Sequence, residues 1–209
     1  SSVAVASTAT TSGNATDTAH STESAVETTD SAATVTPATD IQQDLPTGLV
    51  PLSDSHTQFR GETVGDRFGW SVANVGDVNG DGVDDILMGA PGRNGTGAAY
   101  LFYGPVDESN VSAQDADLTL VGEEVGDRAG WSVAGDDIDA DGYADLVIGA
   151  PRSDSGAENA GAVYVVRGGE SLTGTVSLAS ADTKLLGQQE NERAGFSVAA
   201  RNVTADKSG

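Results

Sequence analysis

Two short acidic segments have the residue types and spacing to hold a metal ion. Residues 77–85 read DVNGDGVDD, and residues 137–145 read DIDADGYAD. Each segment places a carboxylate or amide oxygen at positions 1, 3, 5 and 9, and glycine at position 6, where the chain must turn sharply. Hard cations such as Ca²⁺ take about six to eight oxygen ligands from side chains, backbone carbonyls and water. The spacing therefore predicts one calcium site in each loop, about two in all.

The expected ligands are four side chains of each loop and the backbone carbonyl at position 7. They are Asp77, Asn79, Asp81, the Val83 carbonyl and Asp85, then Asp137, Asp139, Asp141, the Tyr143 carbonyl and Asp145. A helix–loop–helix calcium site is excluded, because it needs glutamate at position 12, where this chain has Met88 and Ile148. The alternative to a calcium site is a solvated acidic turn that binds no ion. Two copies in the same register disfavour it.

Composition narrows the function classes. The 209 residues carry a net charge of −22, which argues against nucleic acid and anionic membranes as direct partners. There is no cysteine, and the two histidines, His20 and His56, lie away from the repeated motifs. Thiolate metal sites are therefore excluded, and only two histidines are available for a histidine-based catalytic triad. Either adaptation to high salt or an ordinary acidic secreted protein accounts for the charge, and the first is favoured.

Residues 1–48 form a segment of different composition. Of the first forty residues, eighteen are serine or threonine, and none is leucine, isoleucine or aromatic. Such a segment buries too little apolar surface to offset its ordering entropy, so we expect a disordered stalk or linker. Asn14-Ala-Thr16 fits a glycosylation sequon, which favours a glycoprotein stalk, and a plain flexible linker is the alternative.

Residues 49–209 are built from repeats. Trp70, Trp131 and Phe196 stand at matching positions, with periods of 61 and 65 residues. The units span about 61–121, 122–186 and 187–209, and the third is truncated. Each complete unit contains four short apolar runs, which predicts a four-stranded antiparallel blade of an all-β, partial β-propeller. The expected strands are 70–75, 85–89, 98–103 and 118–121, then 131–134, 145–149, 162–166 and 184–186.

The order of motifs resembles a known family. Phe68-Gly69, a cation loop and Gly89-Ala90-Pro91 follow one another, as in the FG-GAP repeats of the propeller at the head of integrin α chains. Departures are Ala129 and Ala194 in place of phenylalanine, and Lys207 in place of the turn glycine of a third loop. That third loop is not expected to bind calcium. Because such propellers close into a ring, we expect a piece of a longer protein or self-assembly.

Two other features recur in each unit. The aromatic residues Phe68, Trp70, Trp131 and Phe196 are expected to pack between blades rather than to form a sugar-stacking surface. Asp66-Arg67, Asp127-Arg128 and Glu192-Arg193 are expected to form ion pairs that link strands. Since these features recur in every unit, and no nucleophile elbow or phosphate loop is found, we do not expect an enzyme.

The resemblance implies an extracellular or cell-surface protein that binds a protein or glycan ligand, hence adhesion. It also implies that calcium and ligand lie on opposite faces, which assigns loops 92–97 and 152–161 to the ligand face. The weak contact candidates there are Arg93, Asn94, Arg152 and Asp154. The alternatives are a non-catalytic propeller domain of a secreted hydrolase and a structural cell-surface component.

Overall fold

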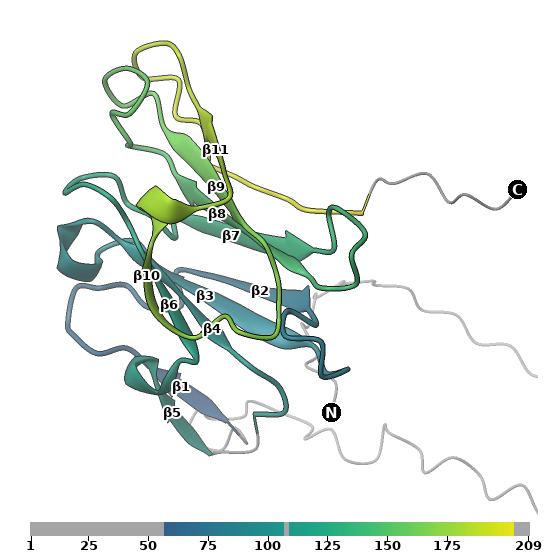
Figure 1. Cartoon of the computed structure of the whole chain (residues 1–209). Helices are drawn as coiled ribbons and strands as arrows, with labels where there is room; N and C mark the ends of the chain where they lie inside the picture. The colour runs from purple at the N-terminus through teal and green to yellow at the C-terminus, as the bar shows by residue number, and fades with distance from the viewer. Residues whose placement is uncertain (1–56, 107–108, 203–209) are drawn as a thin grey trace, which may run out of the picture. The chain divides into compact units, whose positions relative to one another are not determined.

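The computed structural model describes residues 57–106 and 109–202 (Figure 1). The Ser/Thr-rich segment and its sequon, and the third loop from position 203 onward, lie outside the described residues. The expectations made for them stay predictions. No helix in the described part of the chain has the length and apolar character needed to cross a bilayer.

Two antiparallel blades make up most of the described residues, as the sequence predicted. The first blade contains β2 (Ser71–Gly76), β3 (Asp85–Ala90), β4 (Ala98–Phe102) and β6 (Leu118–Val121), paired in the order β6-β4-β3-β2. The second contains β7 (Ser132–Asp136), β8 (Asp145–Ala150), β9 (Ala162–Val166) and β11 (Thr183–Leu186), in the order β11-β9-β8-β7. Every pairing named here is antiparallel. The fold is therefore all-β, with two blades of a partial propeller.

The strands lie where apolar side chains are buried on both faces. Every residue of β4 and β8 is buried, because these inner strands are covered on each side by neighbouring structure. Leu87, Leu101, Leu146, Ile148 and Tyr164 are among the largest side chains that are fully buried. Three short 3₁₀ turns interrupt the connections: η3 (Arg93–Gly95), η4 (Ala113–Asp115) and η5 (Leu178–Ser180). The core thus lies within and between the two sheets.

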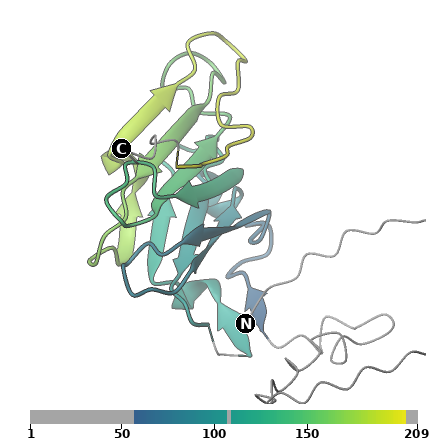
Figure 2. The ribbon, with the colours of Figure 1, turned by 90° about the vertical axis from the view of Figure 1, so that its right-hand side faces the viewer.

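Three short strands were not predicted. β1 (Gln58–Arg60) pairs in parallel with β5 (Asn110–Ser112), and β10 (Gly174–Ser177) pairs in parallel with β6. β10 comes from the second unit of the sequence but joins the sheet of the first. It therefore ties the outer edge of one blade to the connection between β9 and β11 of the next (Figures 1 and 2).

The Gly-Ala-Pro ends of β3 and β8 are contact points between successive units. A Cβ atom added at Gly89 would lie 2.0 Å from the carbonyl oxygen of Gly130, and one added at Gly149 would lie 2.1 Å from that of Gly195. The absence of a side chain lets the next unit approach the strand. Since the same contact occurs twice, residues up to Asn202 start a third unit that packs on the second blade as the second packs on the first.

Candidate functional site

The two acidic loops occupy the same place in successive blades. Residues 77–85 connect β2 to β3, and residues 137–145 connect β7 to β8. In each loop the last aspartate is also the first residue of the following strand, so the loop is fastened directly to a buried strand. The sheet therefore fixes the carboxylate at position 9 before any ion binds.

The carboxylates at position 9 fasten the loops from inside. Asp85 is fully buried, and its two oxygens accept hydrogen bonds from the backbone N–H groups of Val78 (2.9 Å) and Gly104 (2.9 Å). Asp145 does the same with Ile138 (3.0 Å) and Gly168 (3.1 Å). Each oxygen keeps a lone pair for a cation, so these bonds orient the ligand without removing it.

The aspartate at position 1 shapes each turn. Asp77 accepts hydrogen bonds from the N–H groups of Gly80 (2.6 Å), Asp81 (3.1 Å) and Gly82 (2.7 Å). Asp137 accepts from Asp141 (3.1 Å) and Gly142 (3.1 Å). These bonds run from a side chain to backbone N–H groups further along the same loop, and they close the loop around its own carboxylates. Gly82 and Gly142 have φ values of 85° and 96°, so position 6 needs the left-handed conformation that glycine adopts without strain.

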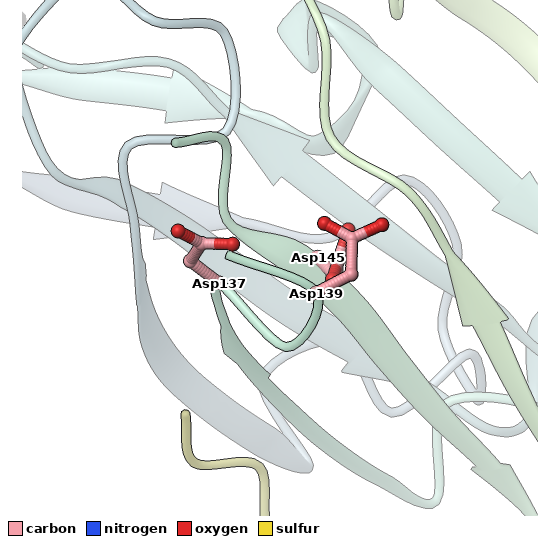
Figure 3. A group of neighbouring side chains, drawn as sticks. All are labelled: Asp137, Asp139 and Asp145. Carbon is pink, nitrogen blue, oxygen red and sulfur yellow. The ribbon is translucent and has the colours of Figure 1, made fainter. Parts of the chain in front are cut away.

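The second loop brings three of its four predicted side-chain ligands together. Oxygens of Asp137, Asp139 and Asp145 all lie within 4.8 Å of one another, the one such acidic group among the described residues. Figure 3 shows the carboxylate of Asp137 turned toward those of Asp139 and Asp145. Asp141 is outside this group, and its Oδ1 accepts a hydrogen bond from the N–H of Tyr143 (2.9 Å).

The first loop has additional hydrogen bonds between its own predicted ligands. The amide nitrogen of Asn79 donates to Asp81 Oδ2 (3.0 Å), while Asn79 Oδ1 accepts from the Asp81 N–H (3.0 Å). The other oxygen of Asp81 accepts from the N–H of Val83 (2.8 Å). An amide at position 3 can donate a hydrogen bond where a carboxylate only accepts, so this loop satisfies part of its negative charge internally.

Like charges and burial make both clusters electrostatically costly. Burial foremost, and then the negative charges of Asp139 and Asp141, raise the pKa of Asp145 above its ordinary value of 3.8. Burial, followed by the charges of Asp81 and Asp77, raises the pKa of Asp85 in the same way. The N–H donors of each aspartate oppose the rise but do not cancel it. A divalent cation would offset this repulsion, so the donor sets fit a hard metal ion.

The loops also touch each other, which the sequence did not indicate. The N–H of Ala144 in the second loop donates to the carbonyl oxygen of Asp77 in the first (2.8 Å). Gly80 packs so closely on the ring of Tyr143 that an added Cβ would lie 2.5 Å from it. One residue outside the loops also enters the second cluster: Arg167 Nη1 lies 3.1 Å from Asp139 Oδ2.

The acid–arginine pairs do not form the expected ion pairs. Within residues 57–106 and 109–202, the ion pairs are Arg93–Glu62, Arg167–Asp139 and Lys184–Glu123. Arg67 and Arg128 instead lie over the rings of Trp70 and Trp131, with the guanidinium carbon 5.4 and 5.6 Å from the ring centroid. Both arginines have positive φ values, 58° and 61°. The sequence contained a signal for this placement of the arginines, because an arginine stands three residues before the aromatic residue in each unit.

Three of the four recurring aromatic residues, Trp70, Trp131 and Phe196, stack between successive units, as expected. The ring centroids of Trp70 and Trp131 are 4.9 Å apart, and those of Trp131 and Phe196 are 5.7 Å apart. The expectation was wrong for Phe68, which packs edge-on against Tyr100 within the first blade. Trp70 and Phe196 nevertheless remain 49% and 55% exposed, so the stack also forms part of the surface.

The ligand-face candidates differ in their contacts. Arg93 lies 3.9 Å from Glu62 and over the ring of Tyr100, and Asp154 accepts a hydrogen bond from the Asn159 N–H (2.6 Å). Asn94 lies in η3 with a φ value of 48°. Arg152 is exposed and lines a hollow between the two blades. These loops lie at the ends of β3 and β8 opposite to the acidic loops.

Comparison of the sequence with known protein families identifies a repeat family. The family model for the FG-GAP repeat matches residues 68–102 and 129–166, which contain both acidic loops and the strands that follow them. The chain contains FG-GAP repeats. Each matched stretch starts at the Phe or Ala before the turn glycine and ends in the third strand of its blade.

Relatives of two kinds share these repeats. The chain is 37% identical over 95 residues to integrin alpha pat-2 of Caenorhabditis briggsae, covering 44% of this chain and 8% of the relative. It is 37% identical over 135 residues to human integrin alpha-IIb, covering 58% and 12%. It is 28% identical over 171 residues to human phosphatidylinositol-glycan-specific phospholipase D, covering 76% and 20%. The chain thus spans a fifth or less of the length of these relatives.

Proposed function

We propose that this chain is a calcium-stabilised binding module of an extracellular or cell-surface protein, with adhesion to a protein or glycan ligand as its role. The observation that carries the proposal is the repetition of a preorganised acidic loop at the same turn of two successive blades. Calcium held there would neutralise the clustered carboxylates and fix the turn between the first two strands of each blade. The blades would then present their opposite loops as a rigid binding surface.

The metal ligands in this proposal are the two complete loop sets. Asp137, Asp139 and Asp145 form the group that is already closest together, and Asp141 would join it by rotating its side chain. In the first loop Asp77, Asn79, Asp81 and Asp85 would take the equivalent roles, and the Val83 and Tyr143 carbonyls would supply the fifth protein ligands. Calcium supplies charge and coordination, not a reaction, so the module acts without catalysis.

Calcium titration of the purified chain tests this proposal. Extracellular calcium modules bind with dissociation constants of about 10⁻⁴–10⁻³ M, and we expect about two sites in this range by calorimetry. At about 100 times the dissociation constant, each site should stabilise the fold by roughly 2.7 kcal/mol. The matched measurement is the melting temperature with calcium and with chelator. Equal melting temperatures, or no heat of binding at about 10 mM calcium, would contradict the proposal.

A second candidate rests on human phosphatidylinositol-glycan-specific phospholipase D, whose similarity covers 76% of the chain, against 58% for human integrin alpha-IIb. In that case the blades would be a non-catalytic domain attached to a secreted hydrolase. The reading frame around this sequence would decide between the two: an adjoining catalytic domain would favour the hydrolase, and its absence would favour the binding module. A structural surface component would contain the same calcium loops but would bind no soluble ligand.

A further inference from the structure

Four arginines gather at the ends of the blades opposite to the acidic loops. Arg67, Arg128 and Arg193 occupy the same position in three successive units, in the turn that precedes the first strand. All three have positive φ values, between 58° and 61°. The fourth, Arg152, follows β8 directly after Pro151. The repeat thus places cationic side chains together on one face of a chain whose net charge is −22.

These arginines surround a hollow between the first and second blades. It has a volume of about 310 Å³, and Arg67, Arg128 and Arg152 line it together with Pro91 and Val125. Glycines of the adjacent turns complete its wall. A smaller hollow of about 50 Å³ continues toward the third unit, between Arg128, Arg152 and Arg193 and beside the rings of Trp131 and Phe196.

The arginines around this hollow have no direct charged partner within the described residues. None of the four guanidinium groups takes part in an ion pair there, and none has a hydrogen-bond partner there. The neighbouring acids Asp66 and Asp127 are buried, 8% and 3% exposed, and form no ion pair with the arginines among the described residues. Burial, and then the charges of Arg152 and Arg67, lower the pKa of the Arg128 guanidinium. An anion placed among these groups would relieve their mutual repulsion.

The same surface has apolar contacts beside its charges. Val125 is 81% exposed at the tip of the turn that carries Arg128, and Trp70 is half-exposed beneath Arg67. Arginine and tryptophan next to small apolar contacts are the composition of binding hot spots between proteins. The guanidinium fork matches a carboxylate with two parallel hydrogen bonds, a pairing that a lysine cannot reproduce.

We propose that this hollow binds an aspartate or glutamate side chain of a protein partner, with apolar neighbours of that carboxylate packed on Val125 and Pro91. A single carboxylate on an otherwise weakly charged surface meets only the local positive field. A polyanionic glycan would instead meet the net charge of −22 along its whole length, which disfavours it. The inference rests on the proposed function in one respect, since it names the partner chemistry of the binding face.

The test uses the full chain in calcium and a pair of matched peptides. One blocked glycine–serine peptide carries a single aspartate between two valines, and the other carries asparagine in its place. NMR should show the aspartate peptide shifting the guanidinium signals of Arg128 and Arg152 and the indole signal of Trp131. The asparagine peptide should bind at least about tenfold more weakly, as the loss of a two-pronged charged pair implies.

Variants of the chain separate local recognition from general charge. R128Q and R152Q should each weaken binding of the aspartate peptide by about tenfold. R60Q removes the same charge from the exposed Arg60 of β1 and should leave binding unchanged. Equal binding of the two peptides, no binding of either at millimolar concentration, or equal losses in all three variants would overturn the proposal. Saturable binding of dextran sulfate to the same arginines, without binding of the peptide, would also overturn it in favour of a glycan.

Calcium-dependent melting, measured on the same samples, keeps the two proposals apart. Peptide binding with no effect of calcium on the melting temperature would contradict the proposed calcium-stabilised module but not the proposed carboxylate site. A calcium effect without peptide binding would do the reverse.

Discussion

Ser71 Oγ donates a hydrogen bond of 2.9 Å to the carbonyl oxygen of Gly130, which joins the first strand of one blade to the turn that opens the next. Ser132 repeats the contact with the carbonyl of Gly195 at 2.8 Å. The contact takes place beside Gly89 and Gly149, where no side chain separates the units. The serine after the recurring aromatic residue and the glycine of Gly-Ala-Pro therefore serve one purpose, the joining of neighbouring blades.

Replacing Ser71 by alanine should weaken this joint. The change leaves the part-buried carbonyl of Gly130 without its side-chain donor, and such a loss costs roughly 1 kcal/mol. Urea unfolding should show this decrease in the free energy of unfolding for S71A. S171A, at an exposed serine of the connection between β9 and β10, is the matched control and should change stability by much less. Equal effects of the two variants would show that the hydrogen bond contributes nothing specific.

Replacing Gly89 by alanine should be more damaging. The new Cβ would lie 2.0 Å from the Gly130 carbonyl oxygen and 2.3 Å from Ser71 Oγ, so the second unit must move away from β3. Overpacking of this kind costs about 1–3 kcal/mol or more. The control is G174A, where an added Cβ meets nothing within 4 Å and only the φ value of 81° is strained, at a cost of about 1–2 kcal/mol. A G89A protein as stable as G174A would mean that the blades are free to separate.

Exchanging the residues at position 3 should exchange the calcium affinities of the loops. D139N gives the second loop the amide of the first, and N79D gives the first loop the carboxylate of the second. Since affinity follows the charge of the ligands, we expect D139N to weaken the second site and N79D to strengthen the first, each by about tenfold. Calorimetry on both variants checks this. Two unchanged affinities would exclude position 3 as a ligand.

N79D should also have a cost in the absence of calcium. Asn79 donates to Asp81 Oδ2 at 3.0 Å, and an aspartate there would replace this bond by repulsion between two carboxylates. The melting temperature of N79D should therefore be lower than that of the parent chain in chelator and should recover when calcium is added. A melting temperature that does not depend on calcium in N79D would contradict the assignment of the first loop.

Asp127 should make the fold less stable at neutral pH than it would be with asparagine. Its side chain is buried, and burial foremost, followed by the charges of Glu124, Glu123 and Asp154, raises its pKa above the ordinary 3.8. A carboxyl whose pKa is raised by folding disfavours the folded state when it is ionised, and this cost disappears as the pH falls through the folded-state pKa. D127N should therefore have a larger free energy of unfolding than the parent chain at about neutral pH.

The stability difference between D127N and the parent chain should shrink as the pH is lowered toward the ordinary pKa. The Oδ atom of asparagine keeps the hydrogen bond that Asp127 accepts from the Glu124 N–H, so the comparison isolates the charge. E158Q removes a charge from an exposed side chain and serves as the control. Urea unfolding as a function of pH measures both. A D127N protein that is less stable than the parent chain at neutral pH would show that the ionised carboxylate is needed.

The sequence predicted the eight blade strands because each has a strong apolar run between Gly, Pro or acidic turns. β10 was missed because Gly-Thr-Val-Ser is mostly exposed, and its partner, β6, belongs to another unit. The acidic loops were found from their spacing alone, but spacing does not say that Ala144 bonds to Asp77. The positions of Arg67 and Arg128 over Trp70 and Trp131 were missed, although arginine stands three residues before the aromatic residue in each unit.

Arg167 should compete with calcium at the second loop. Its Nη1 lies 3.1 Å from Asp139 Oδ2, so a cationic side chain occupies one of the expected ligand oxygens. The described residues place no such competitor at the first loop, because Tyr103 stands at the position of Arg167 in the register of the two blades. The side chain of Arg167 is 61% exposed, and such a pair contributes only about 0–1 kcal/mol to stability.

R167Q should therefore leave the melting temperature in chelator nearly unchanged while it tightens calcium binding at the second site, by about threefold. The first site should keep its affinity. R60Q removes the same charge far from the loop in sequence and should change neither site by a comparable amount. Calorimetric titration of the three proteins separates the outcomes. A weaker second site in R167Q would show that Arg167 holds Asp139 in place for the ion rather than competing with it.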